Sequence, residues 1–181
     1  INVEQGKNGD VWRIIDPTSG RFLAHVFAAK AEIRGRRLRI DSRLVPSPAQ
    51  IFAQKVGARF KVDLIGFLSL EDYLAGVVSS EMSGEWPIEA LKAQAVAARS
   101  FAVARVQERK VSRRAWWLEA SVNDQAFDFE RAHSRSAEAV RATQGEVLVQ
   151  GLGARAVVAA HYHSDWGGRT DEPSTIWGGG P

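Results

Sequence analysis

The sequence from Ser69 to Val103 reads SLEDYLAGVVSSEMSGEWPIEALKAQAVAARSFAV and predicts two consecutive helices. Its first half has the three- and four-residue spacing of apolar side chains that is typical of an amphipathic helix. Gly84 ends this segment, and Pro87 suits the start of the second helix because its missing N–H costs nothing there. Glu81 therefore falls at the break between two predicted helices, which indicates a carboxylate placed for a purpose.

The second predicted helix is rich in alanine from Ala90 to Ala104. Its small residues form a narrow seam that lets another element pack at close range: Leu91, Ala95, Ala98 and Ala102. Gln94 and Arg99 interrupt this apolar surface. Buried polar groups need partners, so one interpretation is that both side chains hold something in place. The other is that they pair with local backbone or face solvent.

Short apolar runs on either side of these helices predict strands. Upstream, proline and glycine break the runs repeatedly, as in a small β-rich unit. After a short helix near residues 136–142, the runs EVLVQ and RAVVAAHYH flank Gly151 and Gly153, which predicts a hairpin. We therefore expect an α+β fold, with a long Ala-rich helix packed against antiparallel strands and an N-terminal β-rich unit. The expected domains are residues 1–68 and 69–181.

Composition narrows the class of protein without identifying its function. The net charge of +3, carried mostly by arginine, suits a polyanion, an anionic cell wall or an ordinary solvated surface. The absence of cysteine rules out a disulfide framework and a thiolate metal site. No apolar run approaches the ~18 residues that would span a bilayer. The chain begins at Ile1 without a methionine, which suggests that a leader or another domain has been removed.

The stretch around Glu81 resembles the SpoIID/LytB family of stage II sporulation protein D and amidase-enhancer relatives. That family carries Tyr-Leu-x-Gly-Val-Val-x-x-Glu-Met-Pro, followed by Glu-Ala-Leu-Lys-Ala-Gln-Ala-x-Ala-Ala-Arg-[Thr/Ser]. The matching residues here are Tyr73, Leu74, Gly76, Val77, Val78, Glu81, Met82 and the run from Glu89 to Ser100. The resemblance continues through Asn123–Phe127 and the loop HYHSDWGGRTDEPSTIWGG, and the chain stops at Pro181, where the family continues into another strand.

The resemblance implies a lytic transglycosylase that cleaves peptidoglycan between N-acetylmuramic acid and N-acetylglucosamine. Glu81 would be the single catalytic acid, the products would carry 1,6-anhydro ends, and strands without peptide stems would be preferred. Near neutral pH this acid must be partly protonated, which predicts desolvation against apolar neighbours such as Met82 or Trp86. The family proline after Glu-Met is Ser83 here, so we expect a less rigid turn behind Glu81.

Candidate substrate-binding residues come from the second helix and from two later loops: Gln94, Arg99, Ser100, Gln125, His163, Ser164, Gly167, Gly168 and Thr170. Glycines let backbone N–H groups approach a sugar, although Gly167 and Gly168 also suit a tight turn. His161 and His163 alternate on one strand face and, with Asp165, raise a zinc hypothesis. Because the chelating spacing His-Glu-x-x-His and cysteine are both missing, we predict neither a metal nor a cofactor.

Two other functions remain open. One is a non-catalytic wall-binding module that enhances an N-acetylmuramoyl-L-alanine amidase, which would make that amidase a partner. The other is a polyanion or nucleic-acid binder, which only the arginine excess motivates; the chain has no nucleic-acid reading motif, so we expect no nucleic-acid partner. The expected partner is the peptidoglycan glycan strand. We expect an extracytoplasmic protein, in the periplasm, in the cell wall or secreted, because a cytoplasmic protein would never meet mature glycan.

Overall fold

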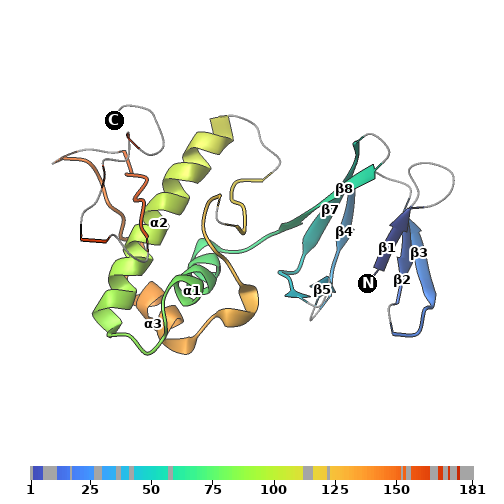
Figure 1. Cartoon of the computed structure of the whole chain (residues 1–181), viewed down its shortest axis with the longest axis horizontal. Helices are drawn as coiled ribbons and strands as arrows, with labels where there is room; N and C mark the ends of the chain where they lie inside the picture. Colours follow the sequence, from blue (N-terminus) through green and yellow to red (C-terminus); the bar gives the residue numbers. More distant parts are fainter. Residues whose placement is uncertain are drawn as a thin grey trace. The chain divides into compact units, whose positions relative to one another are not determined.

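The chain forms two compact units, Ile1–Ser69 and Leu70–Pro181 (Figure 1). The computed structural model describes residues 2–5, 12–16, 18–26, 30–35, 38–40, 43–56, 59–111, 116–121, 123–151, 153, 156–163, 167–168, 171 and 175. The division between the units lies one residue after the domain boundary expected at residue 68.

The first unit is built from antiparallel strands. Within its described residues they form sheets of order β1-β2-β3, β4-β7-β8 and β5-β6. Their bounds are Asn2–Gln5 (β1), Trp12–Ile15 (β2), Phe22–Val26 (β3), Lys30–Ile33 (β4), Arg39–Ile40 (β5), Arg43–Leu44 (β6), Ala49–Val56 (β7) and Arg59–Gly66 (β8). The longest pairing joins β7 to β8, in a register that runs from Ala49 opposite Gly66 to Val56 opposite Arg59.

The second unit is helical. Its helices are Leu70–Glu81 (α1), Ile88–Val111 (α2), the 3-10 turn Phe129–Arg131 (η1) and Ser134–Ala142 (α3). Helices α1, α2 and α3 pack against one another (Figure 1). Their shared core consists of side chains that are at most 1% exposed: Leu74, Val77, Val78, Leu91, Ala95, Ala98, Ala102, Ala139 and Val140. The small residues of α2 let its neighbours approach closely. The predicted α+β class is confirmed.

The break between α1 and α2 lies where the sequence predicts it. Helix α1 ends at Glu81, and α2 begins at Ile88, directly after Pro87. The Pro87 carbonyl accepts the first hydrogen bonds of α2, from the backbone N–H groups of Ala90 at 2.9 Å and Leu91 at 3.2 Å. Proline therefore starts the second helix, as expected for a residue that has no N–H to leave unpaired.

The hairpin expected after α3 is present as a short antiparallel pairing across Gly151 and Gly153. In the described residues of this region, pairing is limited to one antiparallel bridge, Val149 with Val157, and to a hydrogen bond from Val158 N–H to the Leu148 carbonyl at 2.9 Å. The Leu148 N–H donates instead to the Ser100 hydroxyl of α2 at 2.9 Å. Because the Ser100 side chain accepts the Leu148 N–H, this backbone group is bonded to α2 and is not available for pairing with another strand.

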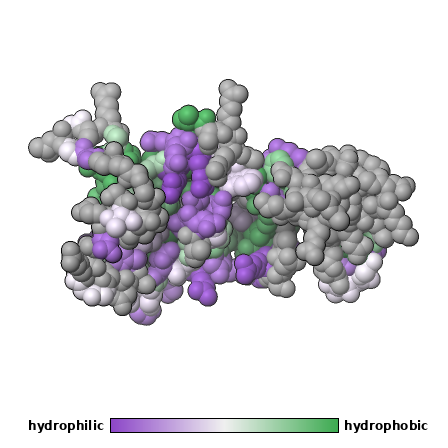
Figure 2. Space-filling view, turned by 45° about the horizontal axis from the view of Figure 1, so that its top comes forward, coloured by the Kyte–Doolittle hydropathy of each residue, from purple (hydrophilic) through white to green (hydrophobic). Residues whose placement is uncertain are grey.

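None of the described helices has the length and apolar character needed to cross a membrane. Figure 2 shows that the visible coloured surface of the helical unit is largely hydrophilic, with hydrophobic residues in separate spots. Scattered apolar side chains of this kind are ordinary on a protein surface and need no binding partner to explain them.

Candidate functional site

Glu81 is the last residue of α1, and its side chain is exposed. Its Oε1 accepts a hydrogen bond from the backbone N–H of Ala126 at 3.3 Å. The predicted burial of Glu81 against apolar neighbours is wrong. Trp86 is itself 53% exposed and does not cover the Glu81 carboxylate. The reason is positional, because the core-forming face of α1 ends at Val78 and Glu81 extends beyond it. Within the described residues, no arginine or lysine forms an ion pair with Glu81.

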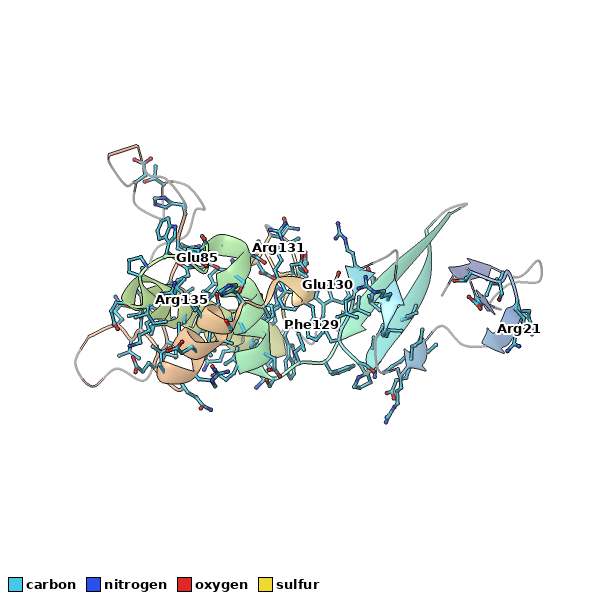
Figure 3. The ribbon with its side chains drawn as sticks, turned by 90° about the horizontal axis from the view of Figure 1, so that it is seen from below. Arg21, Glu85, Phe129, Glu130, Arg131 and Arg135 are labelled. Atoms are coloured by element: carbon cyan, nitrogen blue, oxygen red, sulfur yellow. The ribbon has the colours of Figure 1, made fainter. Side chains whose placement is uncertain are left out.

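The turn behind Glu81 is tied to α3. Ser83 closes it locally, since its carbonyl accepts from Trp86 N–H at 3.1 Å and its hydroxyl from Glu85 N–H at 3.3 Å. The Gly84 carbonyl accepts from Nη1 of Arg135 at 2.7 Å; Glu85 and Arg135 are labelled in Figure 3. A Cβ on Gly84 would lie 2.5 Å from Nδ1 of His133. These contacts restrain the turn where the family has proline.

Gly76 lets a second segment lie directly on α1. A Cβ at this position would lie 2.6 Å from Cε2 of Phe127, a distance that real structures do not tolerate. The Phe127 ring stacks on Tyr73 with 5.1 Å between ring centroids. This close approach brings the neighbouring residue Ala126 to Glu81. The motif glycine of α1 therefore positions the backbone donor that holds the Glu81 carboxylate.

Gln125 joins three parts of the second unit. Its side chain is 2% exposed, and its Oε1 accepts from the Tyr73 hydroxyl at 3.2 Å. Its Nε2 donates to the Ala98 carbonyl of α2 at 3.2 Å and to the Tyr162 hydroxyl at 2.8 Å. The sequence-predicted substrate-binding amide is thus an interior connector beside Glu81.

The two tyrosines around Gln125 stay neutral far above physiological pH. Burial raises the pKa of Tyr162 to about 12, and the negative charge of Glu81 adds to this effect. Burial also raises the pKa of Tyr73 well above its usual value, with smaller contributions from Tyr162, Asp124 and Glu81. Both hydroxyls are therefore permanent hydrogen-bond donors and acceptors at this site.

Tyr162 was not singled out from the sequence, and the structure places its hydroxyl against Gln125. The sequence signal was present, because alternation puts His161 and His163 on one side of the chain and Tyr162 on the other. The structure agrees with this alternation: both histidines are exposed, whereas Tyr162 is half-buried and reaches Gln125. The pKa of His161 is lowered by partial burial and by Arg105.

Arg99 and Ser100 lie inside the protein. Arg99 is 1% exposed and forms two hydrogen bonds to the Glu71 carboxylate, at 2.8 and 3.3 Å. Its remaining donors reach the Val140 and Glu146 carbonyls and the hydroxyl of Thr143. Ser100 is fully buried. Both side chains therefore make their described hydrogen bonds inside the helical unit.

The other candidates are less tightly placed. Gln94 of α2 is half-buried, and its Nε2 has no hydrogen-bond partner within the described residues. Gly167 and Gly168 have positive φ values of 55° and 90°, which agrees with the interpretation that these two glycines form a tight turn. His163 is exposed. The candidates Ser164 and Thr170 lie outside the described residues.

Metal ligands do not gather in the described part of the chain, which contains no cluster of three or more His, Asp or Glu side chains. Asp165, the third member of the zinc hypothesis, lies outside that part.

A buried carboxylate anchors the loop that precedes Gln125. The Asp124 side chain is 0% exposed and accepts from both terminal nitrogens of Arg109, at 2.6 and 2.9 Å. It also accepts from the backbone N–H of Glu119 at 2.7 Å. Bidentate pairing to arginine with an added backbone donor satisfies this buried charge. The end of α2 thereby fixes the point at which the chain enters the site.

Comparison with known proteins adds an independent finding. The model of the SpoIID family, described as stage II sporulation protein, matches residues 58–150, a little over half of the chain. An uncharacterised protein of Brachyspira hyodysenteriae is 33% identical over 116 residues, which are 64% of this chain and 30% of that protein. An amidase enhancer of Bacillus subtilis is 32% identical over 104 residues, which are 58% of this chain and 13% of that protein.

A third relative is the stage II sporulation protein D of Bacillus amyloliquefaciens, 32% identical over 127 residues, which are 61% of this chain and 35% of that protein. The matched region spans about a third or less of the length of each of these curated relatives.

Proposed function

This chain belongs to the SpoIID family of stage II sporulation proteins, and from that premise we propose that it cleaves the glycan strands of peptidoglycan as a lytic transglycosylase. The names of two relatives, an amidase enhancer and a stage II sporulation protein D, support a role in the cell wall. Its substrate lies outside the cytoplasm, and the protein acts there.

Glu81 performs both proton transfers of the reaction. As an acid it donates its proton to the oxygen between N-acetylmuramic acid and N-acetylglucosamine, and the bond from C1 of muramic acid to that oxygen breaks. As a carboxylate it then takes the proton of the muramic 6-hydroxyl, whose oxygen bonds to C1 and closes a 1,6-anhydro ring. Glu81 ends the cycle protonated. Since no water attacks, the second carboxylate of a hydrolase is not needed.

The observation that carries this proposal is the asymmetry of the Glu81 carboxylate. Oε1 is held by the Ala126 N–H, whereas Oε2 has no hydrogen-bond partner in the described part of the chain. One oxygen therefore fixes the orientation, and the other is left to carry the proton. Positioning of this kind is a large part of what an active site contributes to a rate.

Glu81 is exposed in the free protein, but the bound substrate would cover it and so allow it to act as an acid. A glycan strand laid over the end of α1 removes water from the carboxylate, and desolvation favours its protonated form. Trp86, 53% exposed in the turn behind Glu81, offers an aromatic face for a sugar ring. Arg99 and Ser100 then act through packing and make no contact with the sugar.

A non-catalytic role as an amidase enhancer is the second candidate function. It is favoured by the exposed, uncovered state of Glu81 and by the name of the Bacillus subtilis relative. In that case the chain binds the wall and stimulates a partner amidase without breaking a glycosidic bond.

The products of the reaction separate these functions. Purified glycan strands, with and without peptide stems, are incubated with the protein and analysed by mass spectrometry. The proposal predicts 1,6-anhydro ends, formed faster on stem-free strands. Hydrolysed reducing ends would mean a hydrolase. Intact strands, together with faster peptide release when an N-acetylmuramoyl-L-alanine amidase is added, would establish the enhancer role.

A further inference from the structure

The hydrogen bonds of Gln125 determine which way its amide faces. Its nitrogen side lies against the Ala98 carbonyl, a group that only accepts hydrogen bonds. If the amide were turned over, its oxygen would face another carbonyl oxygen, and the buried pair would repel. The NH₂ group must therefore point to Ala98 and to Tyr162, and Oε1 must point to Tyr73.

This orientation gives the two tyrosine hydroxyls opposite roles. Gln125 Oε1 can only accept, so Tyr73 must use its hydroxyl hydrogen on it. Gln125 Nε2 can only donate, so Tyr162 receives a hydrogen bond at 2.8 Å and keeps its own hydrogen. No described residue accepts that hydrogen. A tyrosine hydroxyl with one lone pair occupied and its hydrogen unused is a ready donor to a ligand.

Three further observations place this donor where a ligand of Glu81 would lie. Tyr162 is half-buried, so part of its side chain remains accessible. Tyr162 is bonded to Gln125, and Glu81 is held by the backbone N–H of the next residue, Ala126, so both side chains contact the same short segment. With the pKa of Tyr162 at about 12, the hydroxyl keeps its hydrogen at every pH at which the protein would work.

We propose that Tyr162 is a substrate-binding residue, which donates its hydroxyl hydrogen to an uncharged acceptor oxygen of the sugar bound at Glu81. The acceptor is an acetamide carbonyl or a ring hydroxyl of the glycan strand. This inference rests on the proposed function, because it assumes that the site holds a glycan. Tyr73, which faces the same glutamine from the protein interior, has only a supporting role.

The test measures glycan binding without turnover. In a Glu81→Gln background, which keeps an acceptor for the Ala126 N–H, the dissociation constant of a stem-free GlcNAc–MurNAc tetrasaccharide is measured by calorimetry. Adding Tyr162→Phe removes one hydroxyl and is expected to raise that constant about tenfold, the effect of one well-made hydrogen bond. Adding Tyr73→Phe is the matched control, because it removes the other hydroxyl bonded to Gln125, and its expected effect is below about threefold.

A second measurement remains informative if the Tyr162→Phe variant folds poorly. The chain has two tyrosines, so ¹³C labelling of the tyrosine Cζ atoms gives two signals. Addition of the tetrasaccharide to Glu81→Gln is expected to shift the Tyr162 signal and to leave the Tyr73 signal in place, with assignment from the two Phe variants.

The outcomes separate this inference from the proposed function. If Glu81→Gln binds the tetrasaccharide and the two Phe variants weaken it equally, Tyr162 only supports Gln125 and this inference alone is wrong. An unshifted Tyr162 signal in a saturated complex would also show that Tyr162 does not contact the sugar. If Glu81→Gln binds no glycan, the proposed function fails and this inference fails with it.

Discussion

At the scale of single residues, the site depends on a glycine without a side chain, on the buried Tyr73 and on the half-buried Tyr162. Gly76 has no Cβ, so Phe127 lies on α1 and Ala126 reaches Glu81. Tyr73 and Tyr162 hold Gln125 between them. Because these contacts are short, substitutions that add or remove one or a few atoms should change stability or glycan cleavage measurably.

Gly76→Ala is expected to displace the 125–128 segment from α1. Its Cβ would lie 2.6 Å from Phe127 Cε2 and 3.1 Å from the Asp128 carbonyl. Overpacking costs about 1–3 kcal/mol, against a gain of about 1 kcal/mol from the better helix preference of alanine. Urea unfolding should therefore show a small loss of stability, while the rate of glycan cleavage falls at least about tenfold.

Phe127→Leu in the Gly76→Ala background provides the control, since a smaller side chain removes the clash. Cleavage should recover in part. If Gly76→Ala cleaves glycan at the wild-type rate, the contact between α1 and Phe127 does not position Glu81.

Tyrosine ionisation in the folded protein is expected well above pH 10. Near-ultraviolet phenolate absorbance reports Tyr73 and Tyr162 directly, because the chain has no other tyrosine. The raised pKa values, about 12 for Tyr162, mean that both groups contribute stability fully below their unfolded pKa near 10. This stability is lost as the pH rises through the folded values. A native-state absorbance midpoint at about pH 10, equal to that in denaturant, would show that neither hydroxyl is buried.

At the scale of elements, one arginine ties the three helices together. Arg99 of α2 binds Glu71 of α1 and the Val140 carbonyl of α3, and the neighbouring Ser100 holds the backbone of Leu148. A side chain that is 1% exposed and bonded on every side fixes how the elements meet. The position of Glu81 at the end of α1 follows from that arrangement.

Arg99→Met is expected to destabilise the protein by about 3 kcal/mol, because it leaves the Glu71 carboxylate without its partner. Denaturant unfolding measures the change. Arg34→Met is the matched control: the Arg34–Glu32 pair is exposed, with 77% and 39% of the two side chains accessible, and should be worth less than about 1 kcal/mol. If both variants lose the same free energy of unfolding, the buried hydrogen bonds of Arg99 do not hold the three helices together.

At the scale of the whole molecule, the described hydrogen bonds around Glu81 and Gln125 all join residues of the Leu70–Pro181 unit. We therefore predict that the Leu70–Pro181 unit carries the glycan site by itself. A fragment of residues 69–181 is expected to bind the stem-free tetrasaccharide within about threefold of the full chain, as an autonomous domain would. A fragment that folds by circular dichroism but binds much more weakly would assign part of the glycan site to residues 1–68.

The sequence predicts the helices and the placement of Glu81 because their signals are local. Apolar spacing and Pro87 determine α1 and the start of α2 within a few residues. Tertiary contacts decide the features that were predicted wrongly or missed. Glu81 is exposed because its helix ends beyond the core. The backbone N–H of Leu148 bonds Ser100, and in the described residues the expected hairpin is limited to one bridge. Tyr162 was missed because only the fold brings it to Gln125, which is distant in sequence.

The most direct measurement compares Glu81→Gln with Glu85→Gln, its exposed neighbour in the same turn. The initial rate at which 1,6-anhydro ends appear on stem-free strands is followed by mass spectrometry for both variants and for the wild type. Loss of the acid is expected to lower the rate by at least about a hundredfold, whereas Glu85→Gln should stay within about twofold of wild type. Wild-type rates from Glu81→Gln, or equal losses in both variants, would contradict the assignment of Glu81 as the catalytic acid.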